Sequence, residues 1–279
     1  MYTGSVSITI LVDNKPGTGL VAEHGLSLWI EADGKCILFD TGQGKALPEN
    51  ARQLGIPLEK TDFMVVSHGH YDHTGGLAAA LRVAISASLI LHPNAVVPRY
   101  SIHPEKPPRP IGMPPAARSA ILRVPDGRII WATQPLTFTG QIGITGPIPR
   151  ETSFEDVGGP FFLDPKGEQK DCIADDQALW ISSEEGLIVC VGCCHAGLVN
   201  TLTSIRRLRG NSPIRAVIGG FHLLRADNRR LEQTAEALHS LSPRMLIPCH
   251  CTGDQAVQAL RNSFGDCVLS GYSGMTCRF

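Results

Sequence analysis

Charged residues are scarce in this sequence. Only 18% of its 279 residues are charged, and 25 Lys and Arg against 26 Asp and Glu leave a formal net charge of -1. A chain without a strong electrostatic field does not attract long nucleic acid or an anionic membrane surface, so we expect neither as a partner. Long hydrophobic runs are also missing. Stretches such as 187–191 fall far short of the roughly 20 residues of a membrane-spanning helix.

A secretory signal and a disulfide framework are missing as well. The first residues lack a basic and an apolar region, and from Ser5 they alternate like a strand, so we expect a cytoplasmic protein. The 9 cysteines are odd in number and cluster at 193–194 and 249–251, which indicates reduced thiols. Because no linker or repeat divides the chain, we predict a single domain over residues 1–279.

Proline is unevenly distributed, with 12 of the 20 prolines between Pro93 and Pro149. Proline removes a backbone N–H donor and fits poorly into helices and sheets, so we predict an extended insertion at about residues 98–150. This insertion is either a lid over the body of the protein or an ordinary surface loop. Four cations in or just after it would clamp a phosphate if it folds over a site: Arg99, Lys106, Arg109 and Arg118.

Hydrophobic patterns and turn residues predict strands that alternate with helices. In the first half we expect a hairpin (26–31 and 35–39) around Asp33-Gly34, a helix (46–54), a buried strand (63–67) and a helix (77–82). In the second half we expect a hairpin (177–182 and 187–191), helices (198–208, 231–241 and 254–260) and strands (215–218 and 245–248). This order favours an α+β fold with two sheets and outer helices.

The main chemical signal is His68-x-His70-x-Asp72-His73, which directly follows the predicted strand 63–67. Imidazole and carboxylate groups are ligands that Zn²⁺, Fe²⁺ and Mn²⁺ accept. The motif offers His68 with His70 and Asp72 with His73, which suits two metal ions about 3.5–4 Å apart. The sequence therefore predicts a site for two divalent ions, most simply zinc, with iron or manganese as alternatives.

Two histidines in the second half extend this prediction. His195 and His250 each follow a predicted strand and precede a predicted helix. We expect them to complete the set of metal ligands.

The motif at 68–73, preceded by Ile37-Leu38-Phe39-Asp40-Thr41-Gly42, resembles the metallo-β-lactamase superfamily, and the order of elements extends the likeness over essentially the whole chain. The resemblance implies a four-layer αββα sandwich with a di-metal site at one edge of the sheets. Five further segments resemble the branch of dihydropterin ribofuranosylaminobenzene phosphate synthase-like metal-dependent hydrolases. They are 22–27, 175–179, 192–197, 220–223 and 250–253.

The resemblance also implies roles for single residues. His68 and His70 resemble the ligands of the first metal, and Asp72, His73 and His250 those of the second.

One position departs from the superfamily pattern. At the strand 187–191 most members have a Gly-Asp whose carboxylate bridges the metals, whereas this sequence has His195 instead. We expect His195 to be a ligand without assuming a bridge. Asp176 is a possible substitute carboxylate, although a solvated turn explains Asp175 and Asp176 slightly better. With fewer carboxylates the ions keep more positive charge, which favours an anionic substrate.

Other side chains have two interpretations. Asp40 either orients a ligand histidine or caps a helix. His222 either lines the site, as a substrate or metal contact, or bonds to backbone at a strand end, and His24 is a weaker candidate. Cys249 and Cys251 flank His250 in an extended segment, so we expect their side chains to point away from it and to pack.

The function that these residues favour is a metal-dependent hydrolase or synthase. Metal-activated water, oriented by Asp72 as the catalytic residue, would attack an ester, lactone or phosphoryl centre of a small, anionic, phosphorylated or pterin-like substrate. One alternative is a diiron oxidoreductase, but such proteins have a Glu in the motif where this chain has His70. Another is a metal-retaining binding or signalling protein with residual esterase activity. The sequence makes no prediction of oligomeric state.

Overall fold

The computed structural model describes residues 5–279, which form two compact units. The first unit comprises residues 5–133, 159–175 and 272–279, and the second comprises 134–158 and 176–271. The single domain predicted over residues 1–279 stays a prediction. Among the helices of residues 5–279, none combines the length and the hydropathy that crossing a bilayer requires.

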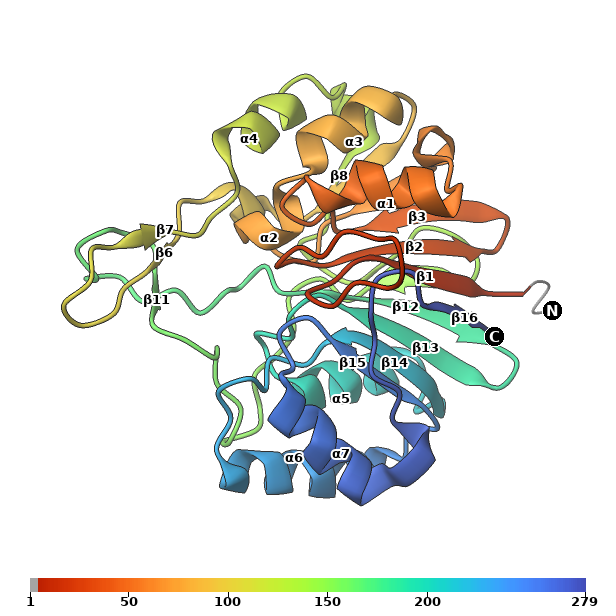
Figure 1. Cartoon of the computed structure of the whole chain (residues 1–279), viewed down its shortest axis with the longest axis vertical. Helices are drawn as coiled ribbons and strands as arrows, with labels where there is room; N and C mark the ends of the chain where they lie inside the picture. Colours follow the sequence, from red (N-terminus) through yellow and green to blue (C-terminus); the bar gives the residue numbers. More distant parts are fainter. Residues whose placement is uncertain (1–4) are drawn as a thin grey trace. The chain divides into compact units, whose positions relative to one another are not determined.

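The first unit is built on a mixed sheet with the strand order β16-β1-β2-β3-β4-β5-β8 (Figure 1). Its strands are β1 (Ser7–Val12), β2 (Ser27–Ala32), β3 (Lys35–Phe39), β4 (Phe63–Val65), β5 (Ser88–Leu91), β8 (Ile129–Trp131) and β16 (Thr276–Arg278). Neighbours from β3 to β8 run parallel, and the others run antiparallel.

Helices of this unit are α1 (Ala46–Leu54), α2 (Tyr71–Thr74), α3 (Leu77–Val83) and α4 (Pro115–Ile121), with 3₁₀ turns η1 (Leu58–Lys60), η2 (Pro93–Val96) and η3 (Asp126–Arg128). Apolar side chains of α1, α3 and α4 pack against Leu38, Met64 and Leu89 of the sheet. The hairpin predicted around Asp33-Gly34 is confirmed. Both turn residues have positive φ, 53° and 66°, as a two-residue type I′ turn requires.

The second unit has a mixed sheet with the order β15-β14-β13-β12-β10-β9. Its strands are β9 (Leu136–Thr137), β10 (Ile142–Ile144), β12 (Ala178–Ser183), β13 (Gly186–Val191), β14 (Ile214–Gly220) and β15 (Leu246–Cys249). Its helices are α5 (Leu198–Leu208), α6 (Asn228–Leu241) and α7 (Asp254–Phe264), followed by η4 (Gly265–Cys267). Leu202, Leu238 and Leu260, one from each helix, join Val189 and Val217 of the sheet in an apolar core.

The proline-rich segment differs from the predicted insertion. Its first part forms β6 (Tyr100–Ser101) and β7 (Arg109–Pro110), and β6 pairs with both β7 and β11 (Phe161–Phe162) in a small third sheet. Later residues do not form an insertion, because β8 pairs with β5 and β10 pairs with β12. Pro110 lies on β7, and the other prolines lie between these elements or, like Pro115, at the start of a helix, where the missing N–H costs nothing.

Candidate metal centre

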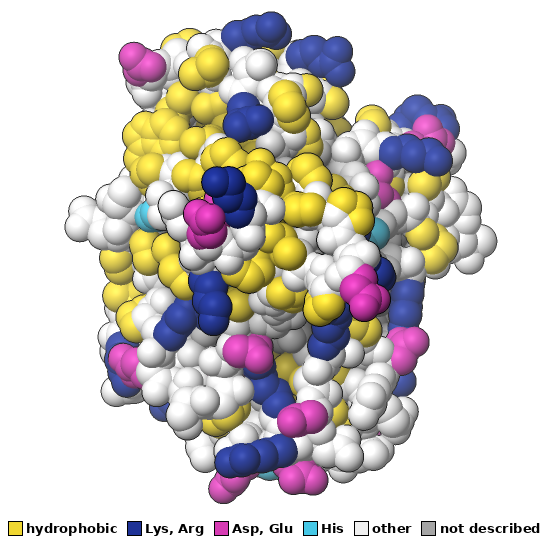
Figure 2. Space-filling view, turned by 90° about the vertical axis from the view of Figure 1, so that its left-hand side faces the viewer, with side chains coloured by type: hydrophobic (Ala, Val, Ile, Leu, Met, Phe, Trp, Pro, Cys, Tyr) yellow, Lys and Arg dark blue, Asp and Glu magenta, His cyan; other side chains and the backbone are white. Residues whose placement is uncertain are grey.

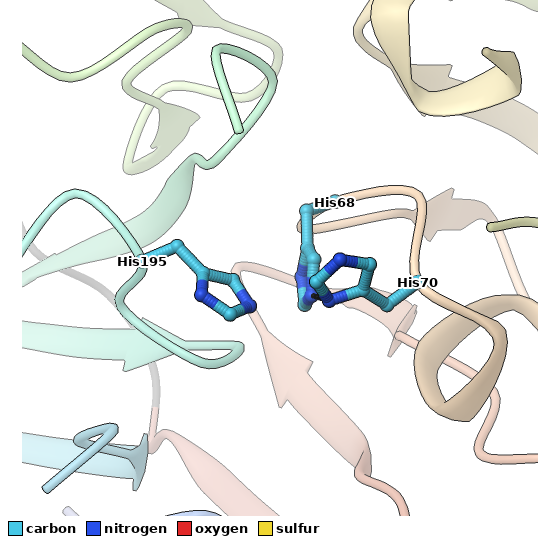
Figure 3. A group of neighbouring side chains, drawn as sticks. All are labelled: His68, His70 and His195. Atoms are coloured by element: carbon cyan, nitrogen blue, oxygen red, sulfur yellow. Dashed lines mark hydrogen bonds between the residues drawn. The ribbon is translucent and has the colours of Figure 1, made fainter. Parts of the chain in front are cut away.

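His68 and His70 follow β4 in the first unit and are both buried. The Nε2 atom of His68 lies 2.9 Å from Nδ1 of His70, so one nitrogen of each ring points to the same place (Figure 3). The other nitrogen of His68, Nδ1, lies 3.0 Å from the Ser67 hydroxyl. This contact holds the His68 ring in position, as metal-binding imidazoles require.

Asp72 and His73 lie on α2, a single helical turn that follows His70. The turn forms because the backbone N–H groups of His73 and Thr74 both donate to the carbonyl of His70. It places Oδ2 of Asp72 4.0 Å from Nε2 of His73. His24, the weaker candidate, is half-exposed and has its Nε2 3.2 Å from the same Asp72 oxygen.

Asp40 is the buried residue that orients His73. Its Oδ2 lies 2.6 Å from His73 Nδ1 and accepts a hydrogen bond from the Ser67 hydroxyl, while Oδ1 accepts from the Ser67 backbone N–H. The alternative of a helix cap is wrong, because the N-cap of α1 is Lys45. With Nδ1 of His73 bonded to a carboxylate, Nε2 is the nitrogen left to bind a metal.

We expect Asp40→Asn to weaken metal binding by about 10–100-fold, the usual effect of removing a carboxylate that supports a ligand histidine. An amide has one acceptor oxygen where Asp40 uses two, so either His73 or Ser67 loses its acceptor. The measurement is a competition titration with a chromogenic chelator. Glu49→Gln, at an exposed pair on α1, is the matched control, and equal affinities for the two variants would contradict the prediction.

In the second unit, three neighbouring parallel strands deliver polar side chains at their carboxyl ends. The loop after β13 contains Cys193 and His195, His222 follows β14, and His250 follows β15. His195 is buried, its Nδ1 lies 2.8 Å from the carbonyl of Val157, and its ring centroid lies 4.3 Å from that of His222. His222 therefore faces His195, a contact that the two interpretations of His222 from the sequence left undecided.

The cysteines beside His250 do not follow the predicted extended geometry. His250 has a φ of +51°, and the chain turns after β15. As a result Sγ of Cys251 lies within 4.8 Å of Sγ of Cys193 and of a ring nitrogen of His250. Cys251 thus lies with the polar groups, and its assignment to packing is wrong. The nine cysteines form no disulfide within residues 5–279, and their reduced state stays a prediction.

The environments of two of these thiols differ in their effect on pKa. Burial raises the pKa of Cys251, but its hydrogen bond to Cys193 and the positive charges of His222 and His250 outweigh burial, so the pKa lies well below its ordinary value. Burial raises the pKa of Cys194, and the charge of Asp176 raises it further. Cys194 is therefore a protonated thiol that packs in the apolar core.

Asp175 and Asp176 are buried, so the solvated turn is wrong for both. Asp176 accepts a hydrogen bond from the backbone N–H of Ala196 at 2.7 Å and so holds the loop of His195. Asp175 accepts from the N–H of Gly69 at 2.7 Å, between His68 and His70. Arg99 is not available to a phosphate, because it is 1% exposed and donates to Asp171 and Asp175.

The chain matches the family model "Metallo-beta-lactamase superfamily" over residues 21–153. The solved structure of Tm1679, a metal-dependent hydrolase of the β-lactamase superfamily, resembles this chain with a TM-score of 0.82 at 30% identity, and the match covers 98% of each chain. The chain belongs to the metallo-β-lactamase superfamily. Its α+β fold, with mixed sheets and flanking helices, confirms the fold class predicted from the motif at 68–73.

Two relatives from Methanocaldococcus jannaschii match along nearly their whole length. One is an uncharacterised protein, 34% identical over 91% of this chain and 93% of the relative. The other is 7,8-dihydropterin-6-methyl-4-(β-D-ribofuranosyl)-aminobenzene-5′-phosphate synthase, 30% identical over 92% of this chain and 90% of the relative. The second match confirms the resemblance to the branch that the sequence indicated.

The donor atoms of this superfamily member fit a metal ion. Nδ1 of His73 is hydrogen-bonded to Asp40, and Nδ1 of His195 is hydrogen-bonded to a backbone carbonyl. This leaves Nε2 of each ring for a metal. Nδ1 of His222 is buried and has no hydrogen-bond partner among residues 5–279. A buried nitrogen without a hydrogen-bond partner is energetically unfavourable unless a bound ligand interacts with it. Imidazole, carboxylate and thiol groups together suit zinc or iron.

Proposed function

We propose that this protein is a metal-dependent hydrolase or synthase that acts on a small, anionic, phosphorylated or pterin-like molecule. The observation that supports it best is the paired geometry of the first unit, with His68 beside His70 and Asp72 beside His73. The metal-dependent hydrolase and the phosphate synthase among the relatives support the reaction classes. We propose a small molecule as the partner, because the net charge of -1 provides no field for nucleic acid.

Bound divalent ions supply an activated water and polarise the group under attack. The residues of the chain hold and orient the reactants. Asp40 and Ser67 fix the rings of His73 and His68. Asp72 is the carboxylate that would orient the attacking water and accept its proton, and His24, 3.2 Å from its Oδ2, is placed to take that proton onward to solvent.

A cation and two aromatic rings lie beside the segment 68–73 of the first unit. Arg109 on β7 is exposed and donates to the hydroxyl of Tyr71 at 2.7 Å, with its guanidinium 5.2 Å from the Tyr71 ring centre. The ring of Phe161 on β11 lies 5.3 Å from that of His70. Figure 2 shows the molecule from the left-hand side of Figure 1, where the small third sheet lies, and Lys and Arg side chains are visible there among hydrophobic ones, together with Asp and Glu. An aromatic substrate with a phosphate group suits these neighbours.

We expect Arg109→Gln to raise KM for phosphorylated substrates by about 10-fold, equivalent to about 1.4 kcal/mol and close to the lower end of the about 1.5–3 kcal/mol that a hydrogen bond to a charged group contributes. For the same compound without phosphate, KM should not change. Steady-state kinetics on the substrate pair is the measurement. Arg123→Gln, at an exposed arginine just after α4, is the control, and an equal rise of KM for both substrates would contradict a phosphate contact.

The proposed function is tested by metal analysis together with a substrate panel of phosphodiesters, lactones and pterin phosphates. We expect at least one tightly bound divalent ion per chain, loss of turnover after dialysis against a chelator, and recovery on adding zinc. Turnover that survives complete removal of metal would overturn the proposal, and so would a purified protein that binds no metal.

A further inference from the structure

The carboxyl ends of β13, β14 and β15 bring together more metal-binding groups than the superfamily pattern accounts for. β13 pairs with β14, and β14 with β15, all in parallel, so the segments that follow them emerge at one edge of the sheet. Besides His195 and His250, this edge of the second unit presents Cys193, His222 and Cys251. No part of the proposed function assigns a role to the two thiols.

Cys193 is common to two groups of donor atoms. Its Sγ, a ring nitrogen of His250 and Sγ of Cys251 all lie within 4.8 Å of one another. Sγ of Cys193 also lies within 4.8 Å of ring nitrogens of His195 and His222. Donor atoms bound to one metal ion at about 2.0–2.3 Å are separated by distances of this order, so small side-chain adjustments would place each group on an ion.

The backbone leaves room for the thiol of Cys251. A Cβ added at Gly220, the last residue of β14, would lie 2.6 Å from Sγ of Cys251 and 3.3 Å from the ring of His250. Any larger residue at 220 would therefore displace the thiol and press on the imidazole. Together with the positive φ of His250, this directs Cys251 toward the imidazoles rather than into the apolar core that contains Cys194.

We propose that Cys193 and Cys251 bind, as thiolates, the metal ion that His250 binds, an inference that rests on the metal centre of the proposed function. Two cysteines and a histidine with an open fourth position form a known catalytic zinc site. Thiolate ligands favour zinc and iron over magnesium and manganese.

This ligand set changes the charge of the centre. Two thiolates compensate the charge of one divalent ion, so the ion itself no longer favours an anionic substrate as strongly as a site with few carboxylates would. Recognition of a phosphate then depends on cationic side chains, of which Arg109 lies next to the ligand segment of the first unit.

X-ray absorption of the zinc-loaded wild-type protein tests the proposal without any substitution. We expect a zinc–sulfur distance of about 2.3 Å next to zinc–nitrogen distances of about 2.0–2.1 Å. The cobalt-substituted protein should show a sulfur-to-cobalt charge-transfer band in the near ultraviolet. Cys193→Ala and Cys251→Ala should each weaken that band and lower zinc affinity by more than about 10-fold, the least that groups supporting a ligand contribute.

Cys190→Ala on β13 and Cys249→Ala on β15 are the matched controls, because both thiols are buried in the same strands that deliver Cys193 and Cys251. They should keep the band and the affinity. Bound zinc with only nitrogen and oxygen neighbours would overturn the thiolate ligands and leave the proposed function intact. A wild-type protein that binds no metal would overturn both.

Discussion

His68→Ala should lose metal and nearly all activity. His68 is fully buried, and its Nε2 lies next to Nδ1 of His70. The Ser67 hydroxyl fixes the orientation of its ring. Even groups that only support a metal ligand are worth about 10–100-fold in affinity or activity. We therefore expect a loss of more than about 100-fold in kcat/KM on the best substrate of the panel, and the bound metal should fall by about one ion per chain.

The control for this variant is His239→Ala. His239 lies on α6 in the second unit and stacks on Phe264, with ring centroids 4.3 Å apart. Its removal should leave metal content and turnover unchanged. Circular dichroism would show whether both variants are folded. A folded His68→Ala protein with full metal content and full turnover would refute the proposed metal centre.

Arg99→Met should cause the largest loss of stability. Arg99 is buried, and its guanidinium donates to Asp171 at 2.7 Å and to Asp175 at 2.9 Å. Burial lowers the pKa of Arg99, but the charges of Asp175 and Asp171 outweigh it and raise the pKa, so the group stays charged. Removing it leaves two buried carboxylates without a cation, which costs about 3–5 kcal/mol in free energy of unfolding. Urea denaturation at neutral pH measures this loss.

Two comparisons make the Arg99 result specific. Asp175→Asn added to Arg99→Met should recover part of the lost stability, because it removes one uncompensated carboxylate. Arg207→Met should have no measurable effect, since the Arg207–Glu151 pair is exposed. If Arg99→Met unfolds at the same urea concentration as Arg207→Met, the buried network contributes nothing to stability.

The Arg99 network also bears on the metal centre. Asp175 accepts from the N–H of Gly69 while it accepts from Arg99. Folded Arg99→Met protein should therefore bind metal more weakly as well, because the segment between His68 and His70 loses the support of a fixed Asp175.

Local structure was largely predictable from the sequence. The helix predicted at 46–54 begins and ends at the predicted residues, and Gly55 closes it with a φ of +66°. The helix at 198–208 also has the predicted bounds. Both predictions rest on hydrophobic periodicity and stop signals, which act within about three turns of helix. The motif at 68–73 could be recognised for the same reason, because its three histidines and one aspartate lie within six residues.

The supporting residues were less predictable. Asp40 had two equal interpretations because it lies 33 positions from His73, and a helix cap explains an isolated Asp after a strand as well. Asp175 lies 106 positions from Gly69, and no local pattern relates the two. Cys251 was misassigned because strand alternation was extended past Cys249, the last residue of β15, although His250 adopts a positive φ.

The sequence by itself determined the elements, the family and the first set of donors, since each depends on residues that are close in the chain. Only the tertiary structure decided which side chains support those donors. It also decided that Arg99 donates hydrogen bonds to buried carboxylates and that two thiols lie beside His250. The physical reason is that strand pairing sets these contacts. The parallel pairing of β13, β14 and β15 brings their carboxyl ends to one edge, and no short stretch of sequence contains that pairing.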